Sequence, residues 1–464
     1  MKKRYLNILL AGLLTTGMLS SCDKDFLDQS PYTGINSGEA LLTDNDVLTA
    51  LYATYSGLQS SDLYGRTIPV IGDLLADNTF VSTYNAGRYL EFEGYFFTRN
   101  TGNISGLWSD AYTVIARTNN IVDSEQTTVT DQANVDQYKG EAYAIRALMY
   151  FELVRHFADP YTENPNAAGV PIVLKTDKDS EPARNSVAEV YAQIQADLDK
   201  AIGLMTKTSN SGRFSQAAAK ALKAKVSLNM GDYEQALMLA DDVISNSGVP
   251  LVSYQNLVSY WASPRPSNVE TLFEVISTET DNMGTNELGY IYHQGGYGDI
   301  LANPELYDSY ASTDARKNLI IKGKRNRGEN PAYIVNKYSN ISGDRDDKKV
   351  LRISEMYLIA AEAAYRLGDE VSALTYLNTL VAERDPSMVY VSTGEQLLQD
   401  IITERRKEMA FEGERLHTLN RLQRDIVARP DGPAEIPFSS DKRILPIPQT
   451  EIDANENIEQ NPGY

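Results

Sequence analysis

The chain has 464 residues, with 63 Asp and Glu against 43 Lys and Arg, and its formal net charge is -20. Such an acidic chain argues against nucleic acid as a partner and against electrostatic adhesion to anionic lipid. It holds one cysteine and three histidines, His156, His293 and His417, which are far apart in the sequence. This composition excludes an intrachain disulfide and a cysteine-based metal site.

The N-terminus has the pattern of a secretory signal, with a basic start and an apolar stretch too short to span a membrane. Small residues then lead to Cys22, as in the lipobox of bacterial lipoproteins, where the cysteine carries lipid. We expect residues 1–21 to be removed and 22–464 to form one domain tethered through Cys22. The acidic residues that follow resemble the surface-export signal of Bacteroidetes lipoproteins, which predicts an outer-membrane location facing the cell exterior.

Most of the remaining chain shows the 3.6-residue periodicity of amphipathic helices, which predicts an all-α fold. The helix at 186–205 is predicted to begin with a capping box formed by Ser186 and Glu189. The expected helices span 44–59, 107–122, 137–157, 186–205, 215–229, 233–245, 351–367, 370–382, 395–411 and 414–425.

Two of the expected helical hairpins share a spacing of small residues around a Gly-Asp turn, Gly231-Asp232 in one and Gly368-Asp369 in the other. Small residues allow two helices to approach closely, as in tetratricopeptide-like helix pairs. The two copies are far more than one repeat apart. We therefore expect helix pairs scattered along the chain with long insertions between them, and no continuous solenoid.

Two long stretches, 78–103 and 254–338, are rich in aromatic residues and glycine and lack helical periodicity. Loops of this length in a compact domain are usually functional or disordered, and the aromatic content argues against disorder. Phe92, Phe96 and Phe97 are expected to pack inward because a phenyl ring has no polar tip, and Trp108 is expected in the core. The basic run at 322–327 is most simply a solvated loop.

An enzyme is the least favoured class. Glu404, Glu408 and Glu412 share one helix face, but beside arginines such a row indicates an ion-paired helix surface rather than a glycosidase pair. His293, beside Gly295 and Gly296, is most simply a loop residue. No nucleotide-binding loop, serine-hydrolase elbow or zinc-protease motif is present.

In its order of motifs the chain resembles the SusD/RagB family of Bacteroidetes outer-membrane lipoproteins nearly from end to end. The resemblance depends on the lipobox with Phe26-Leu27-Asp28; Trp108, Tyr112, Ile115 and Asn119; Gly140-Glu141-Ala142 with Arg146-Ala147 and Tyr150-Phe151; Ala217-Ala218 with Ala221-Leu222; Arg352 with Glu355-Met356-Tyr357-Leu358; Glu404-Arg405-Arg406 with Glu412-Gly413 and Arg415; and Asn461-Pro462-Gly463. The run Leu416-His417-Thr418-Leu419 departs from the family's usual aromatic residues there.

The resemblance implies about four tetratricopeptide-like helix pairs as a scaffold with a loop-rich ligand-facing side. It implies a SusC-like TonB-dependent transporter as partner and capture of oligosaccharides for import. A peptide-capturing RagB-like member and a transporter lid without its own ligand site are alternatives. No cofactor is implied, and whether Ca²⁺ orders an acidic loop such as 344–347 is open.

In the family the ligand loops lie in the two stretches identified above. Sugar rings are recognised by aromatic faces together with a few amide and charged groups. The resemblance therefore implies these candidate ligand residues: Tyr84, Asn85, Arg88, Tyr89, Trp261, Tyr290, Tyr292 and Tyr297.

Overall fold

The structure, a computed structural model, describes residues 40–464 apart from 176, 178, 207–210, 265–267, 326 and 428. The expected signal sequence and Cys22 lie outside the described residues. No helix in the described part of the chain combines the length and apolar character that crossing a bilayer requires.

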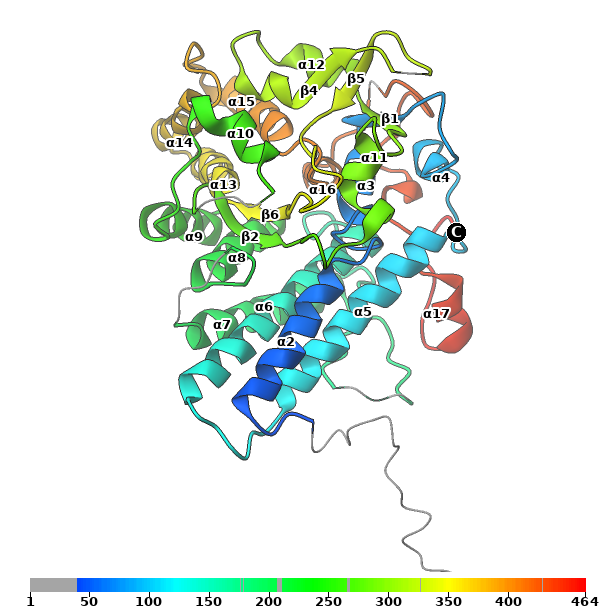
Figure 1. Ribbon diagram of the computed structural model, residues 1–464, viewed down its shortest axis with the longest axis vertical. Coiled ribbons are helices and arrows are strands. Elements are labelled where there is room, and N and C mark those ends of the chain that lie inside the picture. Colours follow the sequence, from blue (N-terminus) through cyan, green and yellow to red (C-terminus); the bar gives the residue numbers. More distant parts are fainter. Residues whose placement is uncertain are drawn as a thin grey trace, which may run out of the picture.

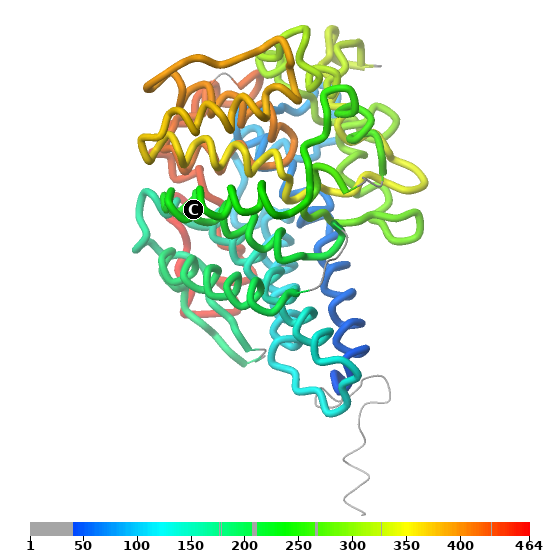
Figure 2. The backbone as a smooth tube through the Cα atoms, turned by 90° about the vertical axis from the view of Figure 1, so that its left-hand side faces the viewer, coloured from blue at the N-terminus to red at the C-terminus, as the bar shows by residue number. Residues whose placement is uncertain are grey.

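The expected helical class is confirmed, and long helices pack as a stack of pairs (Figures 1 and 2). Helix α2 packs on α5, α6 on α7, α8 on α9 and α13 on α14, and α15 packs on α13. Helix α9 contacts α13 although a long insertion separates them, so the insertion lies outside the stack. The bounds are α2 Asp44–Leu58, α5 Gly102–Asp123, α6 Gln132–Phe157, α7 Val187–Leu204, α8 Gln216–Met230, α9 Tyr233–Asn246, α13 Ile353–Arg366, α14 Glu370–Ala382 and α15 Gly394–Glu408.

Local sequence explains how these helices begin and turn. Ser186 and Glu189 form the expected capping box at the start of α7. Gly231 and Gly368 adopt φ of 78° and 86°, a left-handed conformation that glycine tolerates best. The aspartate after each glycine caps the next helix by accepting from a backbone N–H three residues on. The two hairpins therefore share one mechanism.

Several expected boundaries were wrong. Leu351 and Arg352 belong to strand β6 (Lys348–Arg352), which pairs with β2 (Thr271–Val275), so α13 starts later than expected. Helix α15 ends at Glu408, because the chain then turns through Phe411 at φ 69°. The last expected helix is shorter, α16 at Arg415–Arg421. Helix α3 (Thr67–Leu74), in which all eight residues are buried, was not among the expected helices.

The loop-rich stretches form short elements at the end of the molecule opposite the start of α2 (Figure 1). These are β1 Thr79–Val81, α4 Leu90–Glu93, α10 Leu257–Ala262, α11 Leu288–Tyr292, β3 Ile300–Ala302, α12 Pro304–Ser309, β4 Ile320–Gly323 and β5 Ala332–Val335, with the 3₁₀ helices η3 Tyr254–Asn256, η4 Gly284–Asn286 and η5 Ala315–Leu319. The 3₁₀ helix η6 Asp441–Arg443 and the helix α17 Gln449–Ala454 belong to the C-terminal segment instead. Within the described residues the strands make three two-stranded sheets, β1–β3, β2–β6 and β4–β5.

Glu404 and Glu408 on α15 are buried, and Glu412 lies beyond the end of the helix, which corrects the expectation of an ion-paired helix surface. Glu408 accepts from Arg352 Nη1 at 2.7 Å and from Arg384 Nε at 2.9 Å. Arg316 Nη2 donates to Glu404 Oε2 at 2.7 Å, and Arg352 Nη2 to Glu412 Oε1 at 2.7 Å. Because Arg316 lies in the 3₁₀ helix η5, which directly precedes β4, this network joins the helical scaffold to the β4–β5 hairpin.

Candidate binding surface

A small sheet brings the two aromatic stretches together. Strand β1 pairs antiparallel with β3, with Thr79 opposite Ala302 and Val81 opposite Ile300. Strand β5 packs against β3, and Phe80, Leu301, Ala332 and Ile334 form a small apolar cluster. The segments next to these strands, 82–89, 290–299 and the described residues of 324–329, therefore converge.

Asp299 is the main anchor between the three loops. Its backbone carbonyl accepts from the Ser82 N–H at 2.8 Å. Its buried carboxylate accepts from Arg88 Nη1 at 3.0 Å and lies 3.8 Å from Arg325 Nη2. Arg325 also donates to Ser82 Oγ and to the carbonyl oxygens of Tyr84 and Tyr297. One carboxylate and one guanidinium thus fix the relative positions of segments more than 200 residues apart.

Glu329 closes the hairpin turn onto the first loop. Its carboxylate accepts from the Thr83 N–H at 2.7 Å, the Thr83 hydroxyl at 2.9 Å and the Ser82 hydroxyl at 2.8 Å. Partial burial raises the pKa of Glu329, but these hydrogen bonds outweigh burial and leave the pKa below its ordinary value. Glu329 therefore stays ionised and holds the turn in place.

Three tyrosines present rings on the converged loops. The Tyr84 side chain is 49% exposed, and Arg327 and Arg325 lie over its ring at 5.1 and 5.9 Å. Tyr290 and Tyr297 are partly buried and meet edge to face at 5.6 Å.

Arginines lie over the latter two rings. Arg88 lies 3.5 Å from the Tyr297 ring centroid, and Arg345 lies 5.7 Å from that of Tyr290. We call this set the tyrosine–arginine surface: Tyr84, Tyr290, Tyr297, Arg88, Arg325, Arg327 and Arg345.

Asn85 lies within the first loop and shapes it. Its amide nitrogen donates to the Ser82 carbonyl at 2.7 Å, and its amide oxygen accepts from the Gly87 N–H at 2.7 Å. Such a local side-chain turn positions the backbone around Tyr84.

The other three candidate ligand residues are buried. Tyr89 is 5% exposed, and its hydroxyl bonds Thr67 and Arg66. Trp261 is 3% exposed and lies under Lys337 and against Tyr338. Tyr292 is fully buried and stacks on Tyr338. These rings present no face to a ligand in this structure, so we leave them out of the surface.

Of the four aromatic residues expected to pack inward, three are buried and one is exposed. Phe92, Phe97 and Trp108 are buried, as expected. Phe96 is 63% exposed, so its expected packing role was wrong. Its N–H is bonded to the Glu91 carbonyl in a tight turn, and this backbone geometry sets the direction of the ring.

Sequence reasoning missed Asp299, Glu329 and three of the four arginines of the surface. A signal for Arg325 and Arg327 was present in the basic run at 322–327, but its simplest interpretation was a solvated loop. The structure instead stacks both on Tyr84. Asp299 and Arg345 carried no local signal, because their roles depend on partners distant in sequence.

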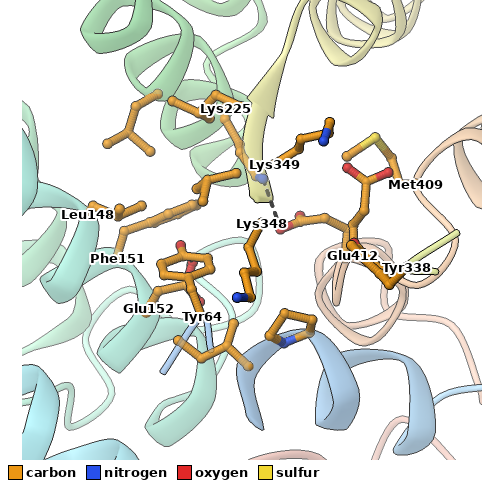
Figure 3. A pocket seen from close by; sticks show the side chains of 16 residues that line it. Tyr64, Leu148, Phe151, Glu152, Lys225, Tyr338, Lys348, Lys349, Met409 and Glu412 are labelled. Atoms are coloured by element: carbon orange, nitrogen blue, oxygen red, sulfur yellow. Dashed lines mark hydrogen bonds and ion pairs between the residues drawn. The ribbon is translucent and has the colours of Figure 1, made fainter. Parts of the chain in front are cut away.

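An internal cavity between β6, α6 and the 409–414 turn is lined by Lys225, Lys348 and Lys349 (Figure 3). Its volume is about 20 Å³, room for about one water molecule. Lys225 pairs with Glu414 at 2.8 Å, and Lys348 pairs with Glu287. The cavity is therefore a junction of ion pairs and too small for a sugar.

A groove of about 370 Å³ lies along α2 and is lined by Tyr52, Gln59, Arg213, Glu274 and Asp281, among others. Here the arginine is neutralised, because Arg213 donates to both carboxylate oxygens of Glu141 at 2.7 and 2.9 Å. None of the sequence-derived candidates lines this groove.

Among the described residues, one group converges as metal ligands do: Glu152, His156 and His417, all buried. Burial lowers the pKa of both histidines, so both are neutral as metal ligands must be. The fit is nevertheless poor, because Arg155 Nη2 donates to Glu152 at 2.5 Å and supplies the positive charge there.

The aspartates at 344, 346 and 347 each accept a hydrogen bond from a backbone N–H of the protein. Asp347 accepts from the Ser277 N–H at 2.8 Å, and Asp346 accepts from the Asn340 N–H at 2.8 Å. Asp344 accepts from the Glu279 N–H at 3.0 Å.

Comparison with known proteins gives a consistent result along the chain. Residues 25–228 match a family described as starch-binding and associating with the outer membrane, and residues 322–464 match the SusD family. SusD-like protein P2 of Formosa agariphila is 29% identical over 532 residues, spanning 100% of both chains.

Solved structures agree. A putative sugar-binding protein from Bacteroides vulgatus superposes with a TM-score of 0.84 at 31% identity, covering 92% of this chain and 99% of its own. A SusD superfamily protein from Bacteroides thetaiotaomicron gives 0.84 at 28% identity, covering 90% and 100%.

Proposed function

Because the chain belongs to the SusD family, a family of non-catalytic binding proteins, we propose that it captures oligosaccharides on the tyrosine–arginine surface. One observation carries the proposal: β1–β3 pairing and Asp299 unite two aromatic loops from distant parts of the sequence into one surface. Tyrosine faces suit the C–H faces of sugar rings, while Asn85 and the arginines offer hydrogen-bond donors to hydroxyls.

In the proposed setting the mature protein, residues 22–464, is anchored by lipid on Cys22 at the outer membrane and faces the cell exterior. It passes its ligand to a SusC-like TonB-dependent transporter. The match to proteins associating with the outer membrane supports this location. Co-purification of such a transporter with a tagged chain from detergent-solubilised outer membranes would test the partnership.

The binding test uses the full lipoprotein purified in detergent and titrated by calorimetry with a panel of neutral and acidic oligosaccharides and peptides. For a glycan that binds, Tyr84→Ala and Tyr297→Ala are each expected to weaken affinity about tenfold, as truncation of a hot-spot aromatic does. Tyr52→Ala, an equally exposed tyrosine on α2, is expected to leave affinity unchanged.

Three outcomes contradict the proposal. Loss of binding only in Tyr52→Ala would move the ligand to the α2 groove. Binding of peptides without any glycan would favour the peptide-capturing alternative. Transport that survives the Tyr84→Ala/Tyr297→Ala double substitution unchanged would favour a lid without its own ligand site. Thermal melts of each variant separate a lost contact from a lost fold.

A further inference from the structure

Arg327 is a cation that the protein does not neutralise. It is exposed, and its contacts among the described residues are the ring and hydroxyl of Tyr84. Elsewhere in the chain Arg146 and Arg421 each place two nitrogens on a single carboxylate, at distances of 2.7–2.8 Å. A guanidinium has five N–H donors, so Arg327 keeps donors for which no described residue is an acceptor.

Arg345 also has an unused donor. One nitrogen donates to the Ile341 carbonyl, while the Nε–H is buried without an acceptor in the described part of the chain. The acids on either side of Arg345 are engaged elsewhere, Asp346 with Asn340 and Asp344 with the Glu279 N–H. No salt bridge joins Arg345 to either acid in the described part of the chain, so its positive charge is not directly paired.

The remaining charges of the tyrosine–arginine surface do not cancel this excess. Asp299 is shared by Arg88 and Arg325, and the Glu329 carboxylate is held by the Ser82 and Thr83 donors. Counting Asp299 and Glu329 against the four arginines leaves two positive charges on this surface, in a protein whose formal net charge is -20.

Resting on the proposed function, we propose that the oligosaccharide bound by this surface is acidic. Its carboxylate or sulfate groups bind Arg327 and Arg345, while its sugar rings pack on the neighbouring tyrosines. A guanidinium can bind two oxygens of one anionic group in its plane while its face stacks on an aromatic ring. Tyr84 beside Arg327 and Tyr290 beside Arg345 supply that combination twice. The groove along α2 does not supply this combination, because its Arg213 is already paired with Glu141.

The test compares each acidic glycan with its own uncharged derivative. Polygalacturonate is paired with its methyl ester, and carrageenan oligosaccharide with its desulfated form; starch and arabinan represent neutral glycans, and polyglutamate represents acidic peptides. We expect at least one acidic glycan to bind about tenfold more tightly than its uncharged derivative. Its affinity should fall as NaCl rises from about 0.1 to about 1 M. Which pair responds distinguishes carboxylate from sulfate.

The outcomes separate the inference from the proposed function. Equal affinity for charged and uncharged derivatives, or binding of neutral glycans alone, overturns the inference and leaves carbohydrate capture standing. Binding of no glycan overturns both, and binding of polyglutamate alone replaces the acidic sugar with an acidic peptide.

Variants identify the arginines responsible. Arg327→Gln and Arg345→Gln are each expected to weaken binding of the acidic glycan about tenfold, with no change for its uncharged derivative. Arg117→Gln, at an exposed arginine on α5, is the matched control and should bind as the parent does. Equal losses for charged and uncharged ligands, or no loss in the double variant, would contradict the assignment.

Discussion

Replacing Glu408 by Gln should strongly destabilise the protein, because three arginines converge on this one carboxylate. Arg352, Arg384 and Arg316 lie 2.7, 2.9 and 3.3 Å from its oxygens, and both Arg352 and Arg384 are fully buried. Glutamine keeps the shape but removes the charge and turns an amide N–H₂ toward guanidinium donors. Breaking a buried ion pair from one side costs about 3–5 kcal/mol. Glu270 still pairs with Arg352 and Arg384, so we expect the lower end of that range.

The assay is urea unfolding followed by circular dichroism. Glu395→Gln, at an exposed glutamate on the same helix, is the control and should change the free energy of unfolding by less than about 0.5 kcal/mol. A Glu408→Gln variant within about 1 kcal/mol of the parent would refute the reasoning that this network stabilises the fold.

The loss should also depend on pH in a defined direction. Burial raises the pKa of Glu408, but the three guanidinium groups outweigh burial and hold the pKa well below its ordinary value. The stability that the carboxylate contributes is therefore complete above pH 4.5, the ordinary pKa, and is lost as the pH falls through the folded-state pKa. The difference between parent and variant should shrink toward acid. A difference that grows toward acid would contradict this sign.

Three further predictions concern single side chains. Asp299→Asn should weaken glycan binding about tenfold by calorimetry, because it removes the charge that orients Arg88 and Arg325; unchanged affinity would contradict that role. Tyr292→Phe should leave binding unchanged and should maintain or raise the melting temperature, because the buried hydroxyl has no partner among the described residues; weakened binding would contradict its exclusion from the surface. Burial raises the pKa of Asp347 to about 7, so ionisation of this carboxyl destabilises the folded parent as the pH rises. In thermal melts, Asp347→Asn should therefore match the parent near pH 4 and become more stable relative to it as the pH rises to about 7. A difference that stays constant with pH would contradict this reasoning.

The helical scaffold was predictable because its determinants are local. Helical periodicity, the Ser186–Glu189 capping box and the glycines at 231 and 368 each act within one or two turns of chain. The short strands β1 and β3 were not predictable. Each has three residues, and each forms only because a partner more than 200 residues away supplies its hydrogen bonds.

The burial of the α15 glutamates shows a related limit. Periodicity correctly placed Glu404 and Glu408 on one face of α15, whereas Glu412 lies beyond the end of the helix. Whether that face is solvated depends on arginines from three other segments, Arg316, Arg352 and Arg384, and their approach follows from the tertiary fold.

The candidate surface was predictable by segment but not residue by residue. Both aromatic stretches contribute, yet tyrosine is equally suited to a core with its hydroxyl bonded and to an exposed face. Tyr84 and Tyr89 lie in the same loop, but Tyr84 is exposed and Tyr89 is buried. The backbone of Tyr89 adopts a positive φ of 61°, which the sequence did not indicate. The role of Arg325 in the basic run at 322–327 depends on the tertiary fold, because pairing of β4 with β5 places this residue over the Tyr84 ring.

Hydrogen–deuterium exchange of the full lipoprotein, with and without a bound oligosaccharide, tests the central claim most directly. We predict that the ligand slows exchange in residues 82–89, 290–299 and 324–329 together, because these three loops build the tyrosine–arginine surface. Slower exchange confined to residues 52–59 and 211–214, along the α2 groove, would contradict it.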